Sequence, residues 1–202
     1  KSFNVGYLFL QKIYYDLHIP NLCKQIAKSH AFSYDLDSIL SRLVYERILH
    51  PCSKRSCFEM ASDLFESANF QLHQIYRALS VIAQESDQIQ ASLYEASKKL
   101  VKRQTGILYY DCTNYFFETD YPDGLKQYGP SKEHRPNPIV EMGLFMDMSG
   151  IPLAFCIHPG NTNEQTTLIP LEKQIMRDFS LSRFIVCTDA GLSSEQNRKF
   201  NN

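Results

Sequence analysis

The chain contains no hydrophobic run long enough to cross a membrane. None of its apolar stretches approaches the roughly 20 residues that a membrane-spanning helix needs. The first residues also lack the charged and then apolar pattern that is typical of a secretory signal. We therefore expect a soluble, cytoplasmic protein that is not secreted.

The motifs of several common enzyme and metal sites are missing as well. The 6 cysteines include no C-x-x-C pair, and the 6 histidines have no spacing typical of metal ligands. No G-x-S-x-G, G-x-x-x-x-G-K-[ST] or H-E-x-x-H pattern occurs, which excludes the usual signatures of serine hydrolases, P-loop proteins and zinc proteases. We expect the cysteines to be reduced thiols that pack as small apolar residues.

Neither sign of charge dominates the composition. Lys and Arg number 21 against 22 Asp and Glu, so any surface for a polyanion must be local. Residues 1–105 carry 13 basic and 10 acidic residues, whereas residues 106–202 carry 8 and 12, so acidic groups concentrate in the second half. With 44% hydrophobic residues, the chain can bury a core and form one large domain or two small ones.

Residues 1–105 have the apolar periodicity of helices. Apolar positions follow helical spacing after Asp35, which is a predicted N-cap, and Pro51 ends that helix. The pattern recurs around Ile75 to Ile82 and again around Ile89 to Leu100. The last helix is predicted to finish in a basic cluster, which is either a solvated helix end or a surface that faces phosphates: Lys98, Lys99, Lys102 and Arg103.

From Gly106 onward the periodicity becomes that of strands. Strands are predicted over 107–112, 139–146 and 151–157, with a hairpin turn at 148–150. Thr162 is predicted to cap a helix over 163–178, and a fourth strand follows over 184–189. Ser193 is predicted to cap a last helix. The fold class is therefore α/β (α+β), with a helical region followed by a mixed sheet in the order β-β-β-α-β-α.

Two aspartates occupy the ends of predicted buried strands. Asp111 follows the first strand segment and Asp189 ends the fourth. The helix over 163–178 must cross over the sheet, and if the fourth strand then lies parallel beside the first, these side chains meet at one sheet edge. Neighbouring strands lie about 4.8 Å apart, so the two carboxylates can share divalent metal ions. The alternative is that each aspartate caps a turn.

Several blocks of residues in the second half resemble a known family. The sequence resembles the catalytic core of bacterial insertion-sequence DDE transposases, which have a ribonuclease-H-like fold. The blocks are YDCTN at 110–114, FFE at 116–118, GPSKEHRPNPIV at 129–140, PGNTNE at 159–164 and TDAGL at 188–192. Residues 1–105 resemble, less specifically, the helical region that precedes this core. The resemblance therefore divides the chain into 1–105 and a partial catalytic core over 106–202.

The resemblance implies a metal-dependent reaction on DNA. Asp111 and Asp189 match the first two metal-binding acids, which hold Mg²⁺ or Mn²⁺ for strand cleavage and transfer at the ends of the element. The implied partner is double-stranded DNA, both element ends and target, together with a homo-oligomer and no membrane. Lys132 and Arg135 either contact phosphates or belong to a solvated loop, and Asn161 either holds the turn at Gly160 or contacts DNA.

The third acid of the family has no counterpart. It is a Glu on a helix after the fourth strand, whereas the only acidic residue after Asp189 is Glu195, which follows the strand too closely. We therefore expect a chain truncated before its third acid, with residues 1–202 inactive by themselves. The alternative is a catalytically inactive remnant that only binds DNA or oligomerises.

Overall fold

The chain folds into two compact units. The computed structural model describes residues 3–66 and 68–201, and it divides into Lys1–Val101 (unit 1) and Lys102–Asn202 (unit 2). The division falls between Val101 and Lys102 rather than after residue 105. Arg103 belongs to unit 2 because its Nε lies 2.6 Å from Asp147 Oδ2 in that unit.

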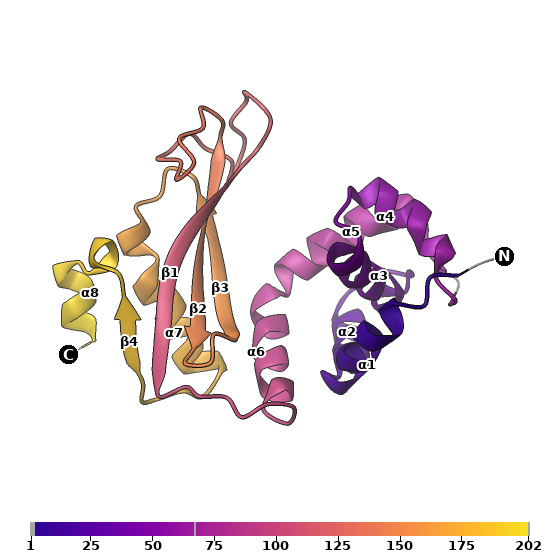
Figure 1. Cartoon of the computed structure of the whole chain (residues 1–202), viewed down its shortest axis with the longest axis horizontal. Coiled ribbons are helices and arrows are strands. Elements are labelled where there is room, and N and C mark those ends of the chain that lie inside the picture. The colour runs from indigo at the N-terminus through magenta and orange to yellow at the C-terminus, as the bar shows by residue number, and fades with distance from the viewer. Residues whose placement is uncertain (1–2, 67, 202) are drawn as a thin grey trace. The chain divides into compact units, whose positions relative to one another are not determined.

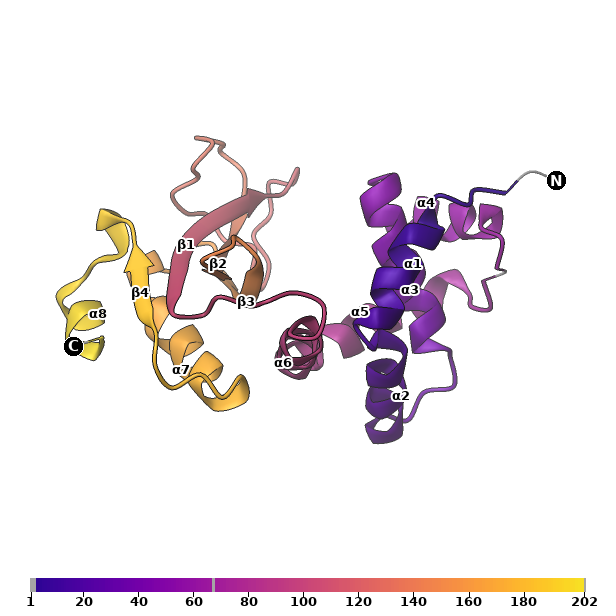
Figure 2. The same ribbon diagram turned by 60° about the horizontal axis from the view of Figure 1, so that its bottom comes forward.

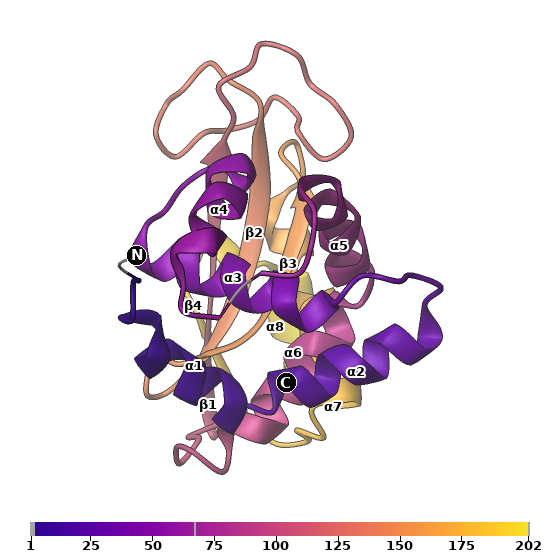
Figure 3. The same ribbon diagram turned by 90° about the vertical axis from the view of Figure 1, so that its right-hand side faces the viewer.

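Unit 1 is helical, as its periodicity predicts. Its central helix is α3 (Leu36–Leu49), which contacts α1, α2, α4 and α5 (Figure 2 and Figure 3). Asp35 caps this helix, since its side chain accepts a hydrogen bond of 3.1 Å from the Ser38 backbone N–H, which confirms the predicted cap. The other helices of unit 1 are α1 (Tyr7–Asp16), α2 (Ile19–Ser29), α4 (Lys54–Met60), η1 (Ala61–Asp63), α5 (Leu72–Gln84) and α6 (Ser86–Ser97).

Unit 2 contains a four-stranded mixed sheet with the order β3-β2-β1-β4 (Figure 1). Its strands are β1 (Ile107–Phe116), β2 (Ile139–Asp147), β3 (Pro152–Pro159) and β4 (Ile185–Thr188). β2 pairs antiparallel with both β1 and β3, whereas β4 pairs parallel with β1. The predicted β-β-β-α-β-α order, the hairpin at 148–150 and the parallel pairing of the first and fourth strands are therefore confirmed.

One face of the sheet is covered by α7 (Leu168–Asp178), which is the crossover between β3 and β4 (Figure 1). Alternate residues of the strands, such as Leu108, Tyr110 and Phe145, are buried on this face. The Tyr110 hydroxyl lies 2.5 Å from Thr167 Oγ1, which precedes α7. The opposite alternation places Asp111 on the exposed side of β1.

Three details of unit 2 differ from the predictions. β1 continues to Phe116, so Asp111 lies within the strand and not at its end. The predicted helix over 163–178 begins as a 3-10 turn, η2 (Glu164–Thr166), which Asn163 caps in place of Thr162, and the helix α8 (Glu195–Phe200) is capped by Ser194 in place of Ser193. The capping-box spacing in a sequence locates the cap of a helix only to within one residue, because neighbouring polar side chains compete for the same backbone N–H groups.

All six cysteines are free thiols, but they do not all pack in the core. Cys23, Cys57 and Cys112 are buried, whereas Cys187 on β4 is exposed. The prediction that Cys187 packs as a small apolar residue is therefore wrong, because it lies on the same open side of the sheet as Asp111. Within the described ranges, no helix is both long and apolar enough to cross a membrane.

Candidate functional site

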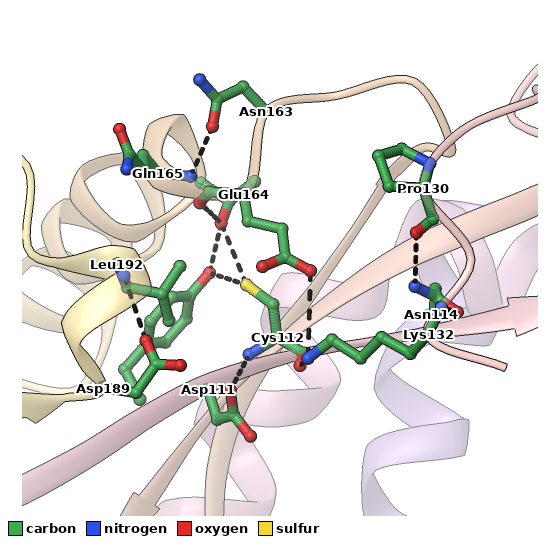
Figure 4. A network of polar contacts seen from close by, with 12 residues as sticks. Asp111, Cys112, Asn114, Pro130, Lys132, Asn163, Glu164, Gln165, Asp189 and Leu192 are labelled. Atoms are coloured by element: carbon green, nitrogen blue, oxygen red, sulfur yellow. Dashed lines mark hydrogen bonds and ion pairs between the residues drawn. The ribbon is translucent and has the colours of Figure 1, made fainter. Parts of the chain in front are cut away.

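The pairing of β1 with β4 brings Asp111 and Asp189 together. The last residue pair of this parallel ladder is Tyr110 with Thr188, so the two aspartates occupy the next position on neighbouring strands. Side chains at matched positions share a face of the sheet, and neighbouring strands lie about 4.8 Å apart. Figure 4 shows the two carboxylates next to each other, both exposed. The observed register of β1 and β4 therefore places the two aspartates side by side on neighbouring strands, as the sequence predicts.

Each aspartate uses one oxygen in a local hydrogen bond. Asp111 Oδ1 accepts a bond of 2.8 Å from the backbone N–H of Cys112, and Asp189 Oδ1 accepts a bond of 3.0 Å from that of Leu192. Asp189 is therefore the N-cap of η3 (Ala190–Leu192), which is the turn-capping role that sequence analysis left open. In each carboxylate, Oδ1 is oriented by a backbone N–H group, whereas Oδ2 takes no part in that hydrogen bond.

The loop between β1 and β2 is tied to the sheet through Asn114. The Asn114 amide donates to the carbonyl of Pro130 at 3.2 Å and accepts from the backbone N–H of Lys132 at 3.3 Å. The GPSKEHRP segment is therefore held against β1, three residues along the strand from Asp111 (Figure 4).

A contact between two glycines joins this loop to the end of β3. A Cβ atom at Gly129 would overlap the carbonyl oxygen of Gly160, and one at Gly160 would overlap the carbonyl oxygens of Ile139 and Gln127. The backbones thus approach more closely than any side chain allows. Gly160 N–H donates to Leu125 O at 3.1 Å. The PGN turn and the GPSKEHRP loop are therefore packed directly on one another.

Lys132 places its ammonium group against the backbone of β1, at the residue that follows Asp111. Its Nζ donates to the carbonyl oxygen of Cys112 and lies 3.9 Å from Glu164 Oε1 (Figure 4). The side chain is about half exposed, at 47% of its accessible area. Lys132 is thus a positioned cation rather than a freely solvated one, with one carboxylate opposing it.

Hydrogen bonds link Gln165, the residue that follows the PGNTNE segment, to the TDAGL segment. Gln165 Nε2 donates to Gly191 O at 2.8 Å, two residues after Asp189. The Asn197 amide donates to Gln165 O at 3.0 Å and to Leu192 O at 2.8 Å. The YDCTN, GPSKEHRP, PGNTNE and TDAGL segments therefore converge on one region of unit 2.

Glu141 is the one buried acid of this region. It lies on β2 opposite Asn114 and is only 2% exposed. Its Oε2 has no hydrogen-bond partner among the described residues. Burial, together with the charge of Glu164, raises the pKa of Glu141 to about 7, while Asn114 and Lys132 act in the opposite direction. Sequence analysis missed it, although Glu141 shares the inward alternation of Ile139 and Phe145.

The remaining predicted DNA-binding residues are at the surface. The Arg135 guanidinium lies over the Phe116 ring, 4.6 Å from its centroid, and its Nε is 3.4 Å from Glu133 Oε2. Asn161 is exposed next to the glycine contact. The turn after Gly160 is closed by Thr162 N–H donating to Pro159 O at 2.9 Å, and the capping amide belongs to Asn163.

The basic cluster at the end of the first half is not a single surface. α6 ends at Ser97, so these residues follow the helix and do not form its last turn. Lys98 pairs with Glu95 at 2.6 Å. Arg103 is buried against Asp147 and donates to Pro152 O at 3.0 Å, which makes it a structural residue of unit 2 and removes it from any phosphate-facing surface.

The donors around Asp111 are compatible with a hard divalent cation. Mg²⁺ is typically held through one or two carboxylates plus phosphate and water oxygens, and Asp111 and Asp189 supply two carboxylates on an exposed face. Within the described ranges, no group of three or more His, Cys, Asp or Glu side chains is arranged to hold a metal ion. These residues therefore fit as part of a ligand set.

Comparison with known proteins gives distant structural similarity alone. No protein-family model and no curated protein sequence matches the chain. It is similar to the Mos1 transposase paired-end complex with left transposon end, at 14% identity and a TM-score of 0.33, over 84% of this chain and 57% of that one. It is also similar to the Mos1 Strand Transfer Complex, at 15% identity and a TM-score of 0.32, over 85% of this chain and 57% of that one. The chain thus spans little more than half the length of these proteins.

Proposed function

We propose that unit 2 is part of the catalytic core of a DDE transposase of the bacterial insertion-sequence type, with a ribonuclease-H-like sheet. Its reaction would be metal-dependent cleavage and transfer of DNA strands at the ends of the element. The observation that carries the proposal is the β1–β4 register, which puts Asp111 and Asp189 at matched positions on neighbouring parallel strands. The packing of the GPSKEHRP segment on Asn114 of β1 and on the PGNTNE segment supports the proposal.

Asp111 and Asp189 would hold Mg²⁺ or Mn²⁺. Such ions stabilise charge on the attacking and leaving oxygens of a phosphoryl transfer. The chain's own contribution is orientation, because the N–H groups of Cys112 and Leu192 each fix one carboxylate oxygen. Both aspartates are exposed, so a phosphodiester can approach their carboxylates.

Lys132, Arg135 and Asn161 would contact the DNA. Lys132 is the strongest candidate of the three, because its ammonium group is held at the carbonyl of Cys112, the residue after Asp111, and can neutralise a phosphate there. Arg135 stacks on Phe116 with 53% of its side chain exposed, and Asn161 is exposed at the PGN turn. Such contacts position duplex DNA and do not read its sequence.

Metal binding to the two aspartates tests the site. Titration calorimetry with Mn²⁺ should detect weak binding to the wild-type protein and at least a tenfold loss in D111N and in D189N, since each removes one of two anionic ligands. D120N, which removes an exposed carboxylate elsewhere in unit 2, is the matched control and should bind as the wild type does. Equal binding by all four proteins would refute the shared site.

A second candidate function is DNA binding without turnover. It is favoured because no group of three or more His, Cys, Asp or Glu side chains among the described residues is arranged to hold a metal ion, whereas a two-metal reaction needs enough anionic ligands to fix both ions. Nicking of supercoiled plasmid DNA with Mn²⁺ separates the two. We expect residues 1–202 alone to bind DNA without nicking it. Nicking that D111N abolishes would show that these residues already form a complete site.

A further inference from the structure

Glu141 is buried where a charged carboxylate is poorly accommodated. It is 2% exposed, and its Oε2 lacks a hydrogen-bond partner among the described residues. Its cross-strand neighbours are Asn114 on β1 and His158 on β3. The Asn114 side chain bonds to Pro130 O and the Lys132 N–H, and its hydrogen bond to Glu141 offsets the cost of burial only in part. An ionised carboxylate in this position is costly, so the neutral acid is favoured.

The charged groups that surround Glu141 come from three elements. Glu164 of η2 opposes ionisation of Glu141, and Lys132 of the β1–β2 loop favours it. On β3, burial lowers the pKa of His158, so its ring is neutral near pH 7 and adds no charge. With burial as the largest cause, the pKa of Glu141 is about 7. Glu141 therefore changes charge in the neutral pH range.

The state of Glu141 changes the charge balance at Lys132. When Glu141 is protonated, the charges of Lys132 and Glu164 balance each other, since Glu164 Oε1 lies 3.9 Å from the ammonium group. When Glu141 is ionised, two carboxylates act on one ammonium group. The local sum then becomes negative, on the side of the site where Lys132 donates to Cys112 O beside Asp111. A phosphate at Lys132 therefore meets more repulsion when Glu141 is ionised than when it is protonated.

We propose that Glu141 regulates the phosphate contact of Lys132, so that DNA binds more tightly when Glu141 is protonated and less tightly once it ionises. This inference rests on the proposed function in one respect, namely that Lys132 contacts a DNA phosphate. It assigns no chemical step to Glu141, which acts on the substrate through Lys132 as a positioning residue.

Binding of a fluorescent DNA duplex at about pH 5.5 and about pH 8.5, at constant ionic strength and without divalent metal, tests the inference. The Kd of the wild-type protein should rise about three- to tenfold more across this range than that of E141Q. K132M should bind more weakly, and E141Q should then change nothing further in the K132M background. E172Q is the matched control, because Glu172 is also buried, at 4% exposure, but bonds to Asn201 instead. It should keep the wild-type dependence on pH.

The outcomes separate this inference from the proposed function. If K132M weakens binding but the wild type and E141Q respond equally to pH, the regulation is wrong and the phosphate contact stands. If K132M binds as the wild type does, the phosphate contact itself fails, and the inference fails with it.

NMR titration of carboxyl-labelled wild-type protein gives a readout that does not require a folded variant. A Glu141 signal that titrates near pH 7 supports the inference, and one that titrates below about pH 5 overturns it.

Discussion

Among the described residues, Arg103 and Asp147 form the most deeply buried ion pair. Their side chains are 4% and 0% exposed. Asp147 also accepts from the backbone N–H groups of Ser149 at 2.9 Å and Ile151 at 3.1 Å, so it organises the β2–β3 turn. Burial alone would raise the pKa of Asp147, but the hydrogen bonds from Arg103, Ile151 and Ser149 outweigh it and lower the pKa.

We expect R103M to destabilise unit 2 by about 3–5 kcal/mol, because it leaves a buried carboxylate without its cation. Urea unfolding measures this loss of stability. K102M, at an exposed neighbouring position, is the control and should change the stability little.

The lowered pKa of Asp147 makes the stability of unit 2 depend on pH. The stabilisation by Asp147 is present above the ordinary pKa of 3.8 and is lost as the pH falls through the folded-state pKa. D147N should therefore show a weaker loss of stability in acid than the wild type. Equal stability of R103M and wild type would contradict the structural role.

At the scale of elements, the site depends on how loops dock on strand ends. The β1–β2 loop meets the end of β3 where Gly129 packs on Gly160, and Gln127 forms two backbone hydrogen bonds with Ile139 at 2.8 and 3.0 Å. This docking fixes the loop that carries Lys132. A side chain at either glycine would separate the two segments.

G160A should lower the stability of unit 2 by about 1–3 kcal/mol, because the added methyl group overlaps the backbone carbonyls of Ile139 and Gln127. G106A is the matched control, since a Cβ at Gly106 meets nothing within 4 Å, and this change should be neutral or slightly stabilising. Thermal unfolding of the three proteins compares them. If G160A and G106A unfold alike, the close approach at Gly160 does not constrain the loop.

At the scale of the whole molecule, the chain consists of two units that each have a core. Tyr7, Ile39 and Ile75 are fully buried in unit 1, and Leu108 and Phe145 are fully buried in unit 2. The connecting residues 98–102 lie outside helices and strands and are exposed. Separate cores joined by an exposed segment are typical of domains that withstand cleavage between them.

Brief treatment with trypsin should therefore cut first after Lys98, Lys99 or Lys102 and leave two fragments of roughly half the chain each. Arg103 should resist, because its side chain is buried. Replacing the three lysines by Gln should protect the segment and is the control, with mass spectrometry identifying the cut sites. First cuts at buried positions such as Arg42 would contradict the division into two units.

Periodicity determined the order of elements in this protein. Helical spacing before residue 98 and strand spacing after residue 106 predict the helices and strands that form, because hydrophobic alternation is a local property of the chain. Strand ends and caps were less well predicted. β1 extends to Phe116 because pairing with β2 continues past Asp111 as far as Ile139, and such pairing depends on a distant segment.

Asp111 and Asp189 could be identified as the candidate pair from sequence patterns, since both follow strand-forming residues and a parallel crossover has few alternatives. The other residues around this pair are brought there by the packing of distant segments. Glu141 is separated from Asn114 by a long loop and from Glu164 by a strand, so its burial and its raised pKa arise only when β2, the loop and η2 pack together. Likewise, Arg103 changes from one of four surface cations to a buried partner of Asp147, because ion pairs between distant segments leave no periodic signal in the sequence.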